Sequence, residues 1–386
     1  MLPLEEIKGA FAARRPVILL DDIASEVNAY LVFPAELATQ ANIAILADQA
    51  LGLVCAAIES SHADQLGLSR MGEARSIKSL DFTLSIEARH GVSTGISAAD
   101  RAHTLKTLAL TSRPELDLVM PGHIFPVRTK KGGVLVKNTP PEACLDLCLL
   151  TDHAPVAAFA ILLDRKGEPL TKTDVINNYA ANHQLKTVTI SGIIRHRLLS
   201  EPIVEEVGRS LLPTLRAGDV TAIVIRSNND GAEHLALLKG TLLDESGGMP
   251  PIPVRVHTEK RIEDLLYGMN NGGRKSIEQA LDLLRNLERG IFLYIRHPRR
   301  GYLKRQAEDI ALAQEPGSGN NLMSSIREYG IGAQILHLLG IRRVILITSS
   351  GKQLAGIENF GLEIVRTFTP DQTTEICNAC QQTTRS

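Results

Sequence analysis

Two hydrophobic patterns alternate along the chain and predict its elements. Short apolar runs predict buried strands at "RPVILLDD" (15–22), "LVCAAIES" (53–59) and "VAAFAILLD" (156–164). Longer stretches with apolar positions three and four residues apart predict helices at "ELATQANIAILADQALG" (36–52) and "SAADRAHTLKTLAL" (97–110). Strands that alternate with helices are typical of an α/β (α+β) fold.

The pattern changes near residue 200. The stretch "SEPIVEEVGRSLLPT" (200–214) reads as a passage between domains, and a new strand pattern begins at "DVTAIVIRS". Helices are predicted at 261–269 and 276–288, with a strand at "GIFLYIRH" after them. Because 386 residues suffice for two or three domains, we expect domains at 1–200 and 201–386.

Charge and hydropathy exclude several classes of protein. The net charge is −1 and the charges are dispersed, so no footprint for nucleic acid or for a membrane surface is present. No apolar run approaches the roughly 20 residues that span a bilayer. The N-terminus "MLPLEEIKGAFAARRP" reads as an amphipathic helix and not as a secretory signal. We expect a cytoplasmic protein.

The five cysteines predict neither a disulfide framework nor a zinc site. An odd count without a secretory signal argues against disulfides. Cys377 and Cys380 form one CxxC pair, which supplies only two of four zinc ligands. The favoured interpretation is a C-terminal tail with two thiols. The remaining cysteines are Cys55, Cys144 and Cys148.

The loop "GMNNGGRKS" (268–276) nearly matches a phosphate-binding P-loop. Gly268 and Gly273 have the required spacing, but Arg274 precedes the Lys-Ser pair and the preceding residues look helical. A P-loop needs a strand before it so that its N–H groups converge on phosphate. The sequence favours a simple turn capped by Ser276, with Gln279 completing a capping box.

Longer motifs show a resemblance to two enzyme families. Residues 5–198 resemble 3,4-dihydroxy-2-butanone 4-phosphate synthase through "GVSTGISAADR" and "PGHIFPVRTKKGGVL". The second half, to about residue 368, resembles GTP cyclohydrolase II through "IPVRVHTE", "LYIRHPRRG" and "REYGIGAQIL". The resemblance implies two domains, each a mixed sheet flanked by helices, and a homodimer through the N-terminal domain.

The resemblance also implies that the loop at 268–276 replaces a zinc site. In the cyclohydrolase family three cysteines hold a catalytic zinc with one open position, where a hydroxide forms. Here those positions carry Lys260, Asn271 and Gly273, and none of them supplies a thiolate. We therefore expect Zn²⁺ to be absent and GTP cyclohydrolase II activity to be lost.

Other cyclohydrolase positions are partly kept. Ser325 replaces the family's proton-accepting aspartate and Pro298 replaces a glutamate, whereas the catalytic arginine is kept as Arg327. The retained arginines could form a basic phosphate pocket or simply make surface salt bridges. The resemblance assigns nucleotide binding to Arg255, His257, Glu259, Arg300, Thr348 and Lys352.

The synthase motifs are altered as well. The family needs carboxylates as acid and base groups and Mg²⁺ to polarise a carbonyl. The family's carboxylates are kept at Asp21, Asp22, Glu26 and Glu142. Glu26, at the metal-ligand position, could therefore still bind Mg²⁺ weakly. The substituted positions, with the family residue each replaces, are Ser25 (arginine), Asn28 (glutamate), Tyr30 (aspartate), Pro140 (the metal-binding histidine) and Ile161 (a catalytic glutamate).

The run "STGISAADR" is intact. Small hydroxyl residues before a helix can hold a phosphate or sugar oxygen through Thr94, Ser97 and backbone N–H groups. Asp100 and Arg101 serve either binding or bracing of that helix. His123 faces a ligand or is a packed, hydrogen-bonded histidine; the sequence leaves both open.

Three hypotheses follow. In the first, both standard activities are lost and the chain binds a phosphorylated ligand or an active paralogue. In the second, it is an enzyme with changed chemistry on a sugar phosphate or a purine nucleotide, which the retained Glu26, Glu142 and Arg327 favour. In the third, it is an ordinary bifunctional enzyme. The substituted metal positions favour the first.

Overall fold

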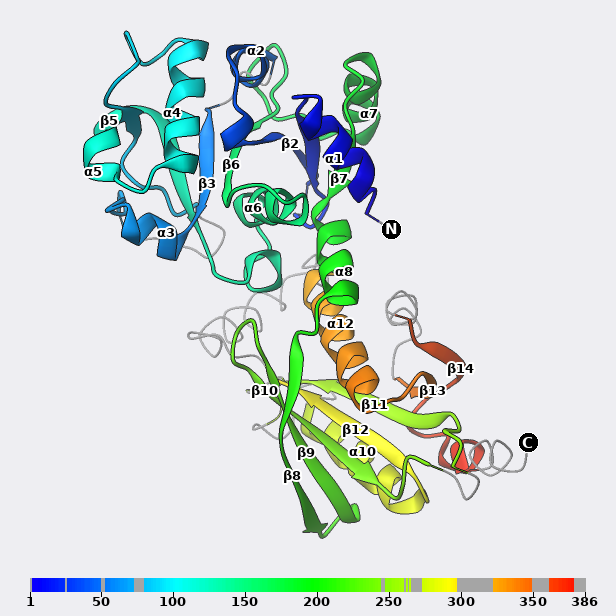
Figure 1. The fold of residues 1–386 in the computed structure, drawn as a ribbon. Coiled ribbons are helices and arrows are strands. Elements are labelled where there is room, and N and C mark those ends of the chain that lie inside the picture. The colour runs from blue at the N-terminus through cyan, green and yellow to red at the C-terminus, as the bar shows by residue number, and fades with distance from the viewer. Residues whose placement is uncertain are drawn as a thin grey trace. The chain divides into compact units, whose positions relative to one another are not determined.

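The computed structural model describes residues 2–24, 26–49, 53–72, 80–243, 247–259, 262, 264, 273–296, 322–348 and 361–377. The helix expected at 261–269 falls largely outside this range, as does the run "KRQAEDIALAQ", whose pattern also predicts a helix. The chain divides into two compact units, Met1–His196 and Arg197–Ser386. Each unit is a mixed sheet with helices on its faces, which confirms the predicted fold class (Figure 1).

The first unit is built on a seven-stranded sheet of order β4-β5-β3-β6-β2-β1-β7. The β1–β2, β2–β6, β3–β6 and β4–β5 pairs are antiparallel, whereas β1–β7 and β3–β5 are parallel. The strands are β1 (Val17–Asp21), β2 (Asn28–Pro34), β3 (Cys55–Glu59), β4 (Ile86–Ala88), β5 (Leu118–Thr129), β6 (Val156–Ile161) and β7 (Thr187–Thr189).

Helices cover both faces of this sheet because its central strands are apolar on both sides. Ala56 and Ile58 of β3 join the core cluster that includes Leu105, while Cys55 and Ala57 are buried on the opposite face. The helices are α1 (Leu4–Ala12), α2 (Gln40–Ala44), α3 (Ser60–Gln65), α4 (Ala98–Leu110), α5 (Pro114–Asp117), α6 (Pro140–Leu150), α7 (Thr173–Asn182) and α8 (Ile190–Ser200), with short turns η1 (Ala35–Leu37), η2 (Ile45–Gln49) and η3 (Gly133–Leu135).

The second unit has a seven-stranded sheet of order β14-β13-β11-β12-β10-β9-β8. Helix α10 (Gly273–Asn286) packs Ala280 and Leu284 onto a core that includes Phe292, and α12 (Leu322–Leu338) contacts β8 and β12. The strands are β8 (Val204–Thr214), β9 (Gly218–Ser227), β10 (Glu233–Lys239), β11 (Ile252–Thr258), β12 (Gly290–Ile295), β13 (Arg343–Ile347) and β14 (Glu363–Phe368).

Three sequence predictions need correction. The helix expected over 36–52 begins only at Gln40, where Thr39 and Asn42 form a capping box, and ends in a π-turn. The run "SLDFTLSIEA" (79–88), whose alternating pattern predicts a strand, is regular only over Ile86–Ala88. The passage expected at 200–214 is largely the edge strand β8, whose side chains are mostly exposed.

No helix in the described part of the chain is both long enough and apolar enough to cross a membrane.

Candidate functional site

Glu142 lies at the start of α6 and is fully buried. One carboxylate oxygen accepts a hydrogen bond from the Lys130 N–H at 3.2 Å, and the other accepts from the Thr139 hydroxyl. The Lys137 ammonium lies 3.7 Å away. Burial raises the pKa of Glu142, and Lys137 and Thr139 oppose that rise. These contacts hold the turn after β5 against α6; a catalytic role for Glu142 stays a prediction.

The carboxylates at the end of β1 accept hydrogen bonds from other groups of the chain. Asp21 accepts from the Ala24 N–H at 3.2 Å, and Asp22 accepts from the N–H and hydroxyl of Ser191. Glu26 is exposed. Pro140, at the family's second magnesium position, is the first residue of α6 and has no donor atom in its side chain. Among the described residues at these family positions, the exposed Glu26 carboxylate is the remaining candidate ligand, and such a donor set fits Mg²⁺ poorly.

Two substituted positions of the synthase half lie side by side. Tyr30 on β2 faces Ile161 on β6 in the antiparallel register, so both side chains project from the same face of the sheet. Burial raises the pKa of Tyr30, and the nearby Asp21 carboxylate adds to the rise. The resemblance leads us to expect two carboxylates here, and the sheet instead carries a phenol beside an aliphatic side chain.

The intact "STGISAADR" run forms the loop before α4. Ser97 is the N-cap of α4, with its hydroxyl accepting from the Asp100 N–H at 3.0 Å. The Asp100 carboxylate accepts from the Ser93 N–H, the Ser93 hydroxyl and the Gly95 N–H at 2.9–3.1 Å. Burial acts to raise the pKa of Asp100, but these hydrogen bonds outweigh it and lower the pKa. Asp100 therefore braces the loop, one of the two roles that the sequence left open.

Thr94 and Arg101 remain available to a ligand at this loop. Thr94 is exposed at its tip. Arg101 is half-buried, burial lowers the pKa of its guanidinium, and its buried Nε has no hydrogen-bond partner among the described residues. Buried donors normally have a partner, so this nitrogen is suited to an anionic group.

His123 pairs with a residue that the motifs did not single out. Its Nδ1 lies 3.1 Å from the Glu87 carboxylate, which also lies against Gly95 of the loop. The period-two pattern of "SIEA" was the only signal for Glu87. Lys130, which contacts Glu142, is seven residues beyond His123 and directly follows β5, so at about 3.3 Å per residue the two sites are roughly 20 Å apart. A single chain therefore does not place the His123 and Glu142 sites within reach of one small ligand.

In the second unit, the retained polar residues lie around the ends of β11 and β13. The partly buried Arg255 donates to the Ile347 carbonyl at 3.1 Å and to the Ser276 hydroxyl at 3.0 Å, and burial lowers the pKa of its guanidinium. Glu259, 6% exposed, lies 3.7 Å from Arg296. Buried Thr348 donates its N–H to the Phe368 carbonyl. Arg300 and Lys352 lie outside the described residues, as does the side chain of Arg327 on α12.

The start of α10 corrects one local prediction. The helix begins at Gly273, so Ser276 lies inside it and is not its N-cap. Most of the remaining loop, including Asn271, lies outside the described residues, as does Lys260. At the family's three cysteine positions, Lys260 carries an ammonium, Asn271 an amide and Gly273 only a hydrogen atom. These groups do not fit Zn²⁺, which is bound by thiolates, imidazoles and carboxylates.

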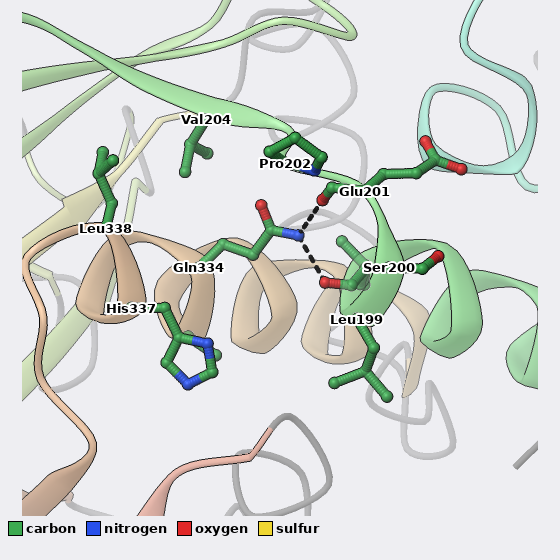
Figure 2. Close-up of a pocket in the computed structure, with 10 residues that line it drawn as sticks. Leu199, Ser200, Glu201, Pro202, Val204, Gln334, His337 and Leu338 are labelled. Atoms are coloured by element: carbon green, nitrogen blue, oxygen red, sulfur yellow. Dashed lines mark hydrogen bonds between the residues drawn. The ribbon is translucent and has the colours of Figure 1, made fainter.

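A cavity of about 390 Å³ in the second unit lies at a place that the motifs did not indicate. Figure 2 shows Gln334 of α12 donating to the Leu198 and Glu201 carbonyls. Its side-chain oxygen accepts from the Ile203 N–H at 2.9 Å. Gln334 therefore fixes the segment that leads into β8, and the cavity walls are largely apolar.

Each half of the chain matches a known protein family. Residues 5–196 match the family model of 3,4-dihydroxy-2-butanone 4-phosphate synthase, and residues 205–369 match that of GTP cyclohydrolase II. The riboflavin biosynthesis protein RibBA of Salinispora arenicola is 34% identical over 370 residues, covering 94% of this chain and 87% of its own.

Two further similar proteins carry names other than RibBA. The monofunctional riboflavin biosynthesis protein RIBA 2 of Arabidopsis thaliana is 34% identical over 90% of this chain and 72% of its own. The crystal structure of RibBX, a two-domain 3,4-dihydroxy-2-butanone 4-phosphate synthase from A. baumannii, aligns with a TM-score of 0.75 at 27% identity, over 95% of this chain and 99% of that one. The chain belongs to the riboflavin biosynthesis family that joins a 3,4-dihydroxy-2-butanone 4-phosphate synthase unit to a GTP cyclohydrolase II unit.

Proposed function

We propose that this family member has lost both standard activities and binds a phosphorylated ligand. The observation that carries the proposal is the Tyr30–Ile161 pair, which occupies adjacent positions on one face of the sheet where two carboxylates are expected. Enediolate chemistry needs acid and base groups with perturbed but accessible protons. A partly buried phenol whose pKa is raised and an aliphatic side chain cannot supply them.

The second unit supports the same proposal through its residue types. Lys260, Asn271 and Gly273 cannot generate a zinc-bound hydroxide. The family relationship itself does not require loss of activity, since the relatives are named as riboflavin biosynthesis proteins. The argument for loss depends on these particular side chains.

The loop before α4 supports binding of a phosphorylated ligand. Asp100 holds the loop in place, Thr94 is exposed at its tip, and Arg101 has a buried Nε without a partner in the described chain. A guanidinium beside a helix N-terminus suits a phosphate group. The ligand class is therefore a small sugar phosphate or nucleotide.

The proposal includes a homodimer through the first unit. The His123 and Glu142 sites are roughly 20 Å apart along β5, so one small ligand could contact both only if two chains contribute. Ile96, in the loop itself, is 60% exposed, as is expected of a side chain that a partner covers. Pairing with an active paralogue through this surface is the other form of the proposal.

One observation favours altered chemistry instead. Glu87 and His123 form a carboxylate–imidazole pair beside the intact loop, an arrangement that orients a histidine for proton transfer. Proton transfer on ribulose 5-phosphate or another sugar phosphate is the reaction that this pair would support.

The deciding experiment measures formate. Purified protein is incubated with ribulose 5-phosphate and Mg²⁺, and separately with GTP and Zn²⁺, beside an active synthase and an active cyclohydrolase as positive controls. We expect no formate above background in either reaction. Clear turnover in one of them would overturn the loss of that activity.

A second prediction concerns Arg101. A ligand at 100 times its Kd stabilises the folded state by about 2.7 kcal/mol, which for a unit of this size is roughly 5–10 °C in Tm. We expect ribulose 5-phosphate to raise the Tm of the wild type by this amount. The rise should be mostly absent in Arg101→Ala. Arg113→Ala, an exposed arginine beyond α4, is the matched control. Equal shifts in all three proteins would contradict the assignment.

A further inference from the structure

The edge strand β8 leaves one side of the second sheet open and carries exposed apolar side chains. Within the described residues only β9 pairs with it. Leu211 is 71% exposed, and Val207 is exposed as well. A long edge strand of this kind can pair with another strand unless the chain blocks it. Pro213 is such a block, but it stands at the far end of β8 and leaves the segment 204–211 open.

The pairing of β8 with β9 shows which side chains of β8 share a face. Alternate residues of β9 project from the same face. One such set is Thr221, Ile223, Ile225 and Ser227. The β8 residues opposite this set, and therefore on the same face, are Leu211, Arg209, Glu206 and Val204. The register shifts between Glu206 and Gly208, so Val207 is the extra residue of a bulge. The other face carries Glu205, Ser210 and Leu212.

The first of these faces also holds the apolar cavity of about 390 Å³. Val204 lines the cavity together with Leu338 of α12 and Leu199 of α8 (Figure 2). Leu199 and Leu338 are both exposed, so the apolar wall reaches the surface at the start of β8. The strand therefore has an apolar recess near one end and an exposed leucine near the other, on the same face.

A second copy of the chain fits this edge when two β8 strands run antiparallel about a twofold axis. Residues that face each other across two paired strands lie on the same face of the joined sheet. This condition holds when Val204 faces Leu211 of the second copy, which also sets Glu206 opposite Arg209. The bulge excludes the registers one residue away, because they oppose side chains of different faces. Each contact then occurs twice, as in any isologous pair.

The chemistry is complementary at each of these positions. Leu211 covers the recess beside Val204, which removes apolar surface from water at both ends of the strand. Arg209 donates to both carboxylate oxygens of Glu206 at 2.9 Å within one chain. Both charges thus lie on the open edge, where they can bond across the twofold axis instead. A strand that complements itself favours a second copy of this chain over an unrelated peptide.

We infer that β8 is a self-association surface, through which two copies of the second unit join their sheets with Val204–Leu211 and Glu206–Arg209 contacts. The contact is separate from a homodimer through the first unit and does not depend on the proposed function. One pair of strands is a small interface, so we expect a weak contact that covalent trapping detects best.

A disulfide in the full chain tests the register. Glu205 and Ser210 are exposed and face each other in the inferred pair. Within one chain they are roughly 16 Å apart, beyond the reach of a disulfide. We expect Glu205→Cys/Ser210→Cys to give cross-linked dimers on a non-reducing gel after mild oxidation. Glu205→Cys/Leu212→Cys, on the same face but two residues out of register, is the control, and the wild type reports the native cysteines. Equal trapping of the two pairs, or no trapping of the first, would overturn the inference.

Charge reversal separates the contact across the axis from the ion pair within one chain. In the Glu205→Cys/Ser210→Cys chain, adding Glu206→Arg opposes two arginines and adding Arg209→Glu opposes two carboxylates. Each should reduce trapping by about tenfold. In a mixture of the two, every arginine faces a glutamate of the other chain, although each chain keeps its own like charges. We therefore expect the mixed product, identified by a longer tag on one chain, to recover. A mixture that traps no better than either variant alone refutes the pairing.

The exposed leucines give a further matched comparison. Leu211→Asp places a charge at the recess and should reduce trapping by about tenfold. Leu215→Asp makes the same change at a side chain that is 98% exposed and lies just beyond β8, so trapping should stay at the level of the parent chain. Equal effects of the two variants would show that Leu211 does not cover the recess.

Discussion

Gly240→Ala is expected to destabilise the second unit by about 3–5 kcal/mol, which lowers its Tm by roughly 10 °C. Gly240 follows β10 with φ +69, in the left-handed region that favours glycine. A Cβ there would lie 2.2 Å from the Glu288 carbonyl oxygen. Because that neighbour is backbone, no side-chain rotation relieves the contact. Urea unfolding followed by circular dichroism measures the loss.

Gly231→Ala is the matched control for this prediction. Gly231 has almost the same conformation, φ +67, but a Cβ there meets nothing within 4 Å. It should therefore cost only the left-handed penalty of about 1–2 kcal/mol. The difference between the two variants isolates the contact with Glu288. Equal losses would mean that the close approach of the two backbone segments does not contribute.

Hydrophobic periodicity predicted the elements best where both faces of a strand are covered. The run 53–59 contains β3 and the run 156–164 contains β6, since both strands lie inside the sheet and are apolar throughout. The same method missed β8, an edge strand exposed along nearly its whole length, because it has no buried face to produce an alternation.

The helix predicted over 36–52 shows a different limit. Its apolar residues are spaced as in one helix, but Thr39 and Asn42 make a capping box that starts a new helix at Gln40. The local hydrogen bonds of Thr39 outweigh the continuity of the pattern. The polar residues alone could have indicated this start, since Thr39 and Asn42 have capping-box spacing.

Motifs located the candidate sites, but not the partners within them. The "SAADR" run identified Asp100, whereas its three hydrogen bonds to Ser93 and Gly95 depend on how the loop folds back over α4. Likewise Tyr30 and Ile161 are 131 positions apart, and only the β2–β6 register makes them neighbours. Contacts set by sheet register are not encoded in any local pattern.

Glu142→Ala is expected to cost about 3–5 kcal/mol of stability in the first unit, the typical cost of removing one partner of a buried charged pair. The substitution leaves the Lys130 N–H without its acceptor and the Lys137 ammonium without its counter-charge. Glu142→Gln keeps an acceptor and most of the volume, so its loss should be clearly smaller.

Glu168→Ala, at an exposed glutamate in the same unit, serves as the control and should stay within about 0.5 kcal/mol of wild type. Urea unfolding of all three variants distinguishes two roles for Glu142. A residue kept only for catalysis leaves stability unchanged or improved when it is removed, whereas a residue that holds the turn after β5 destabilises the unit. A loss below about 1 kcal/mol in Glu142→Ala would contradict the structural role and would strengthen the hypothesis of retained chemistry.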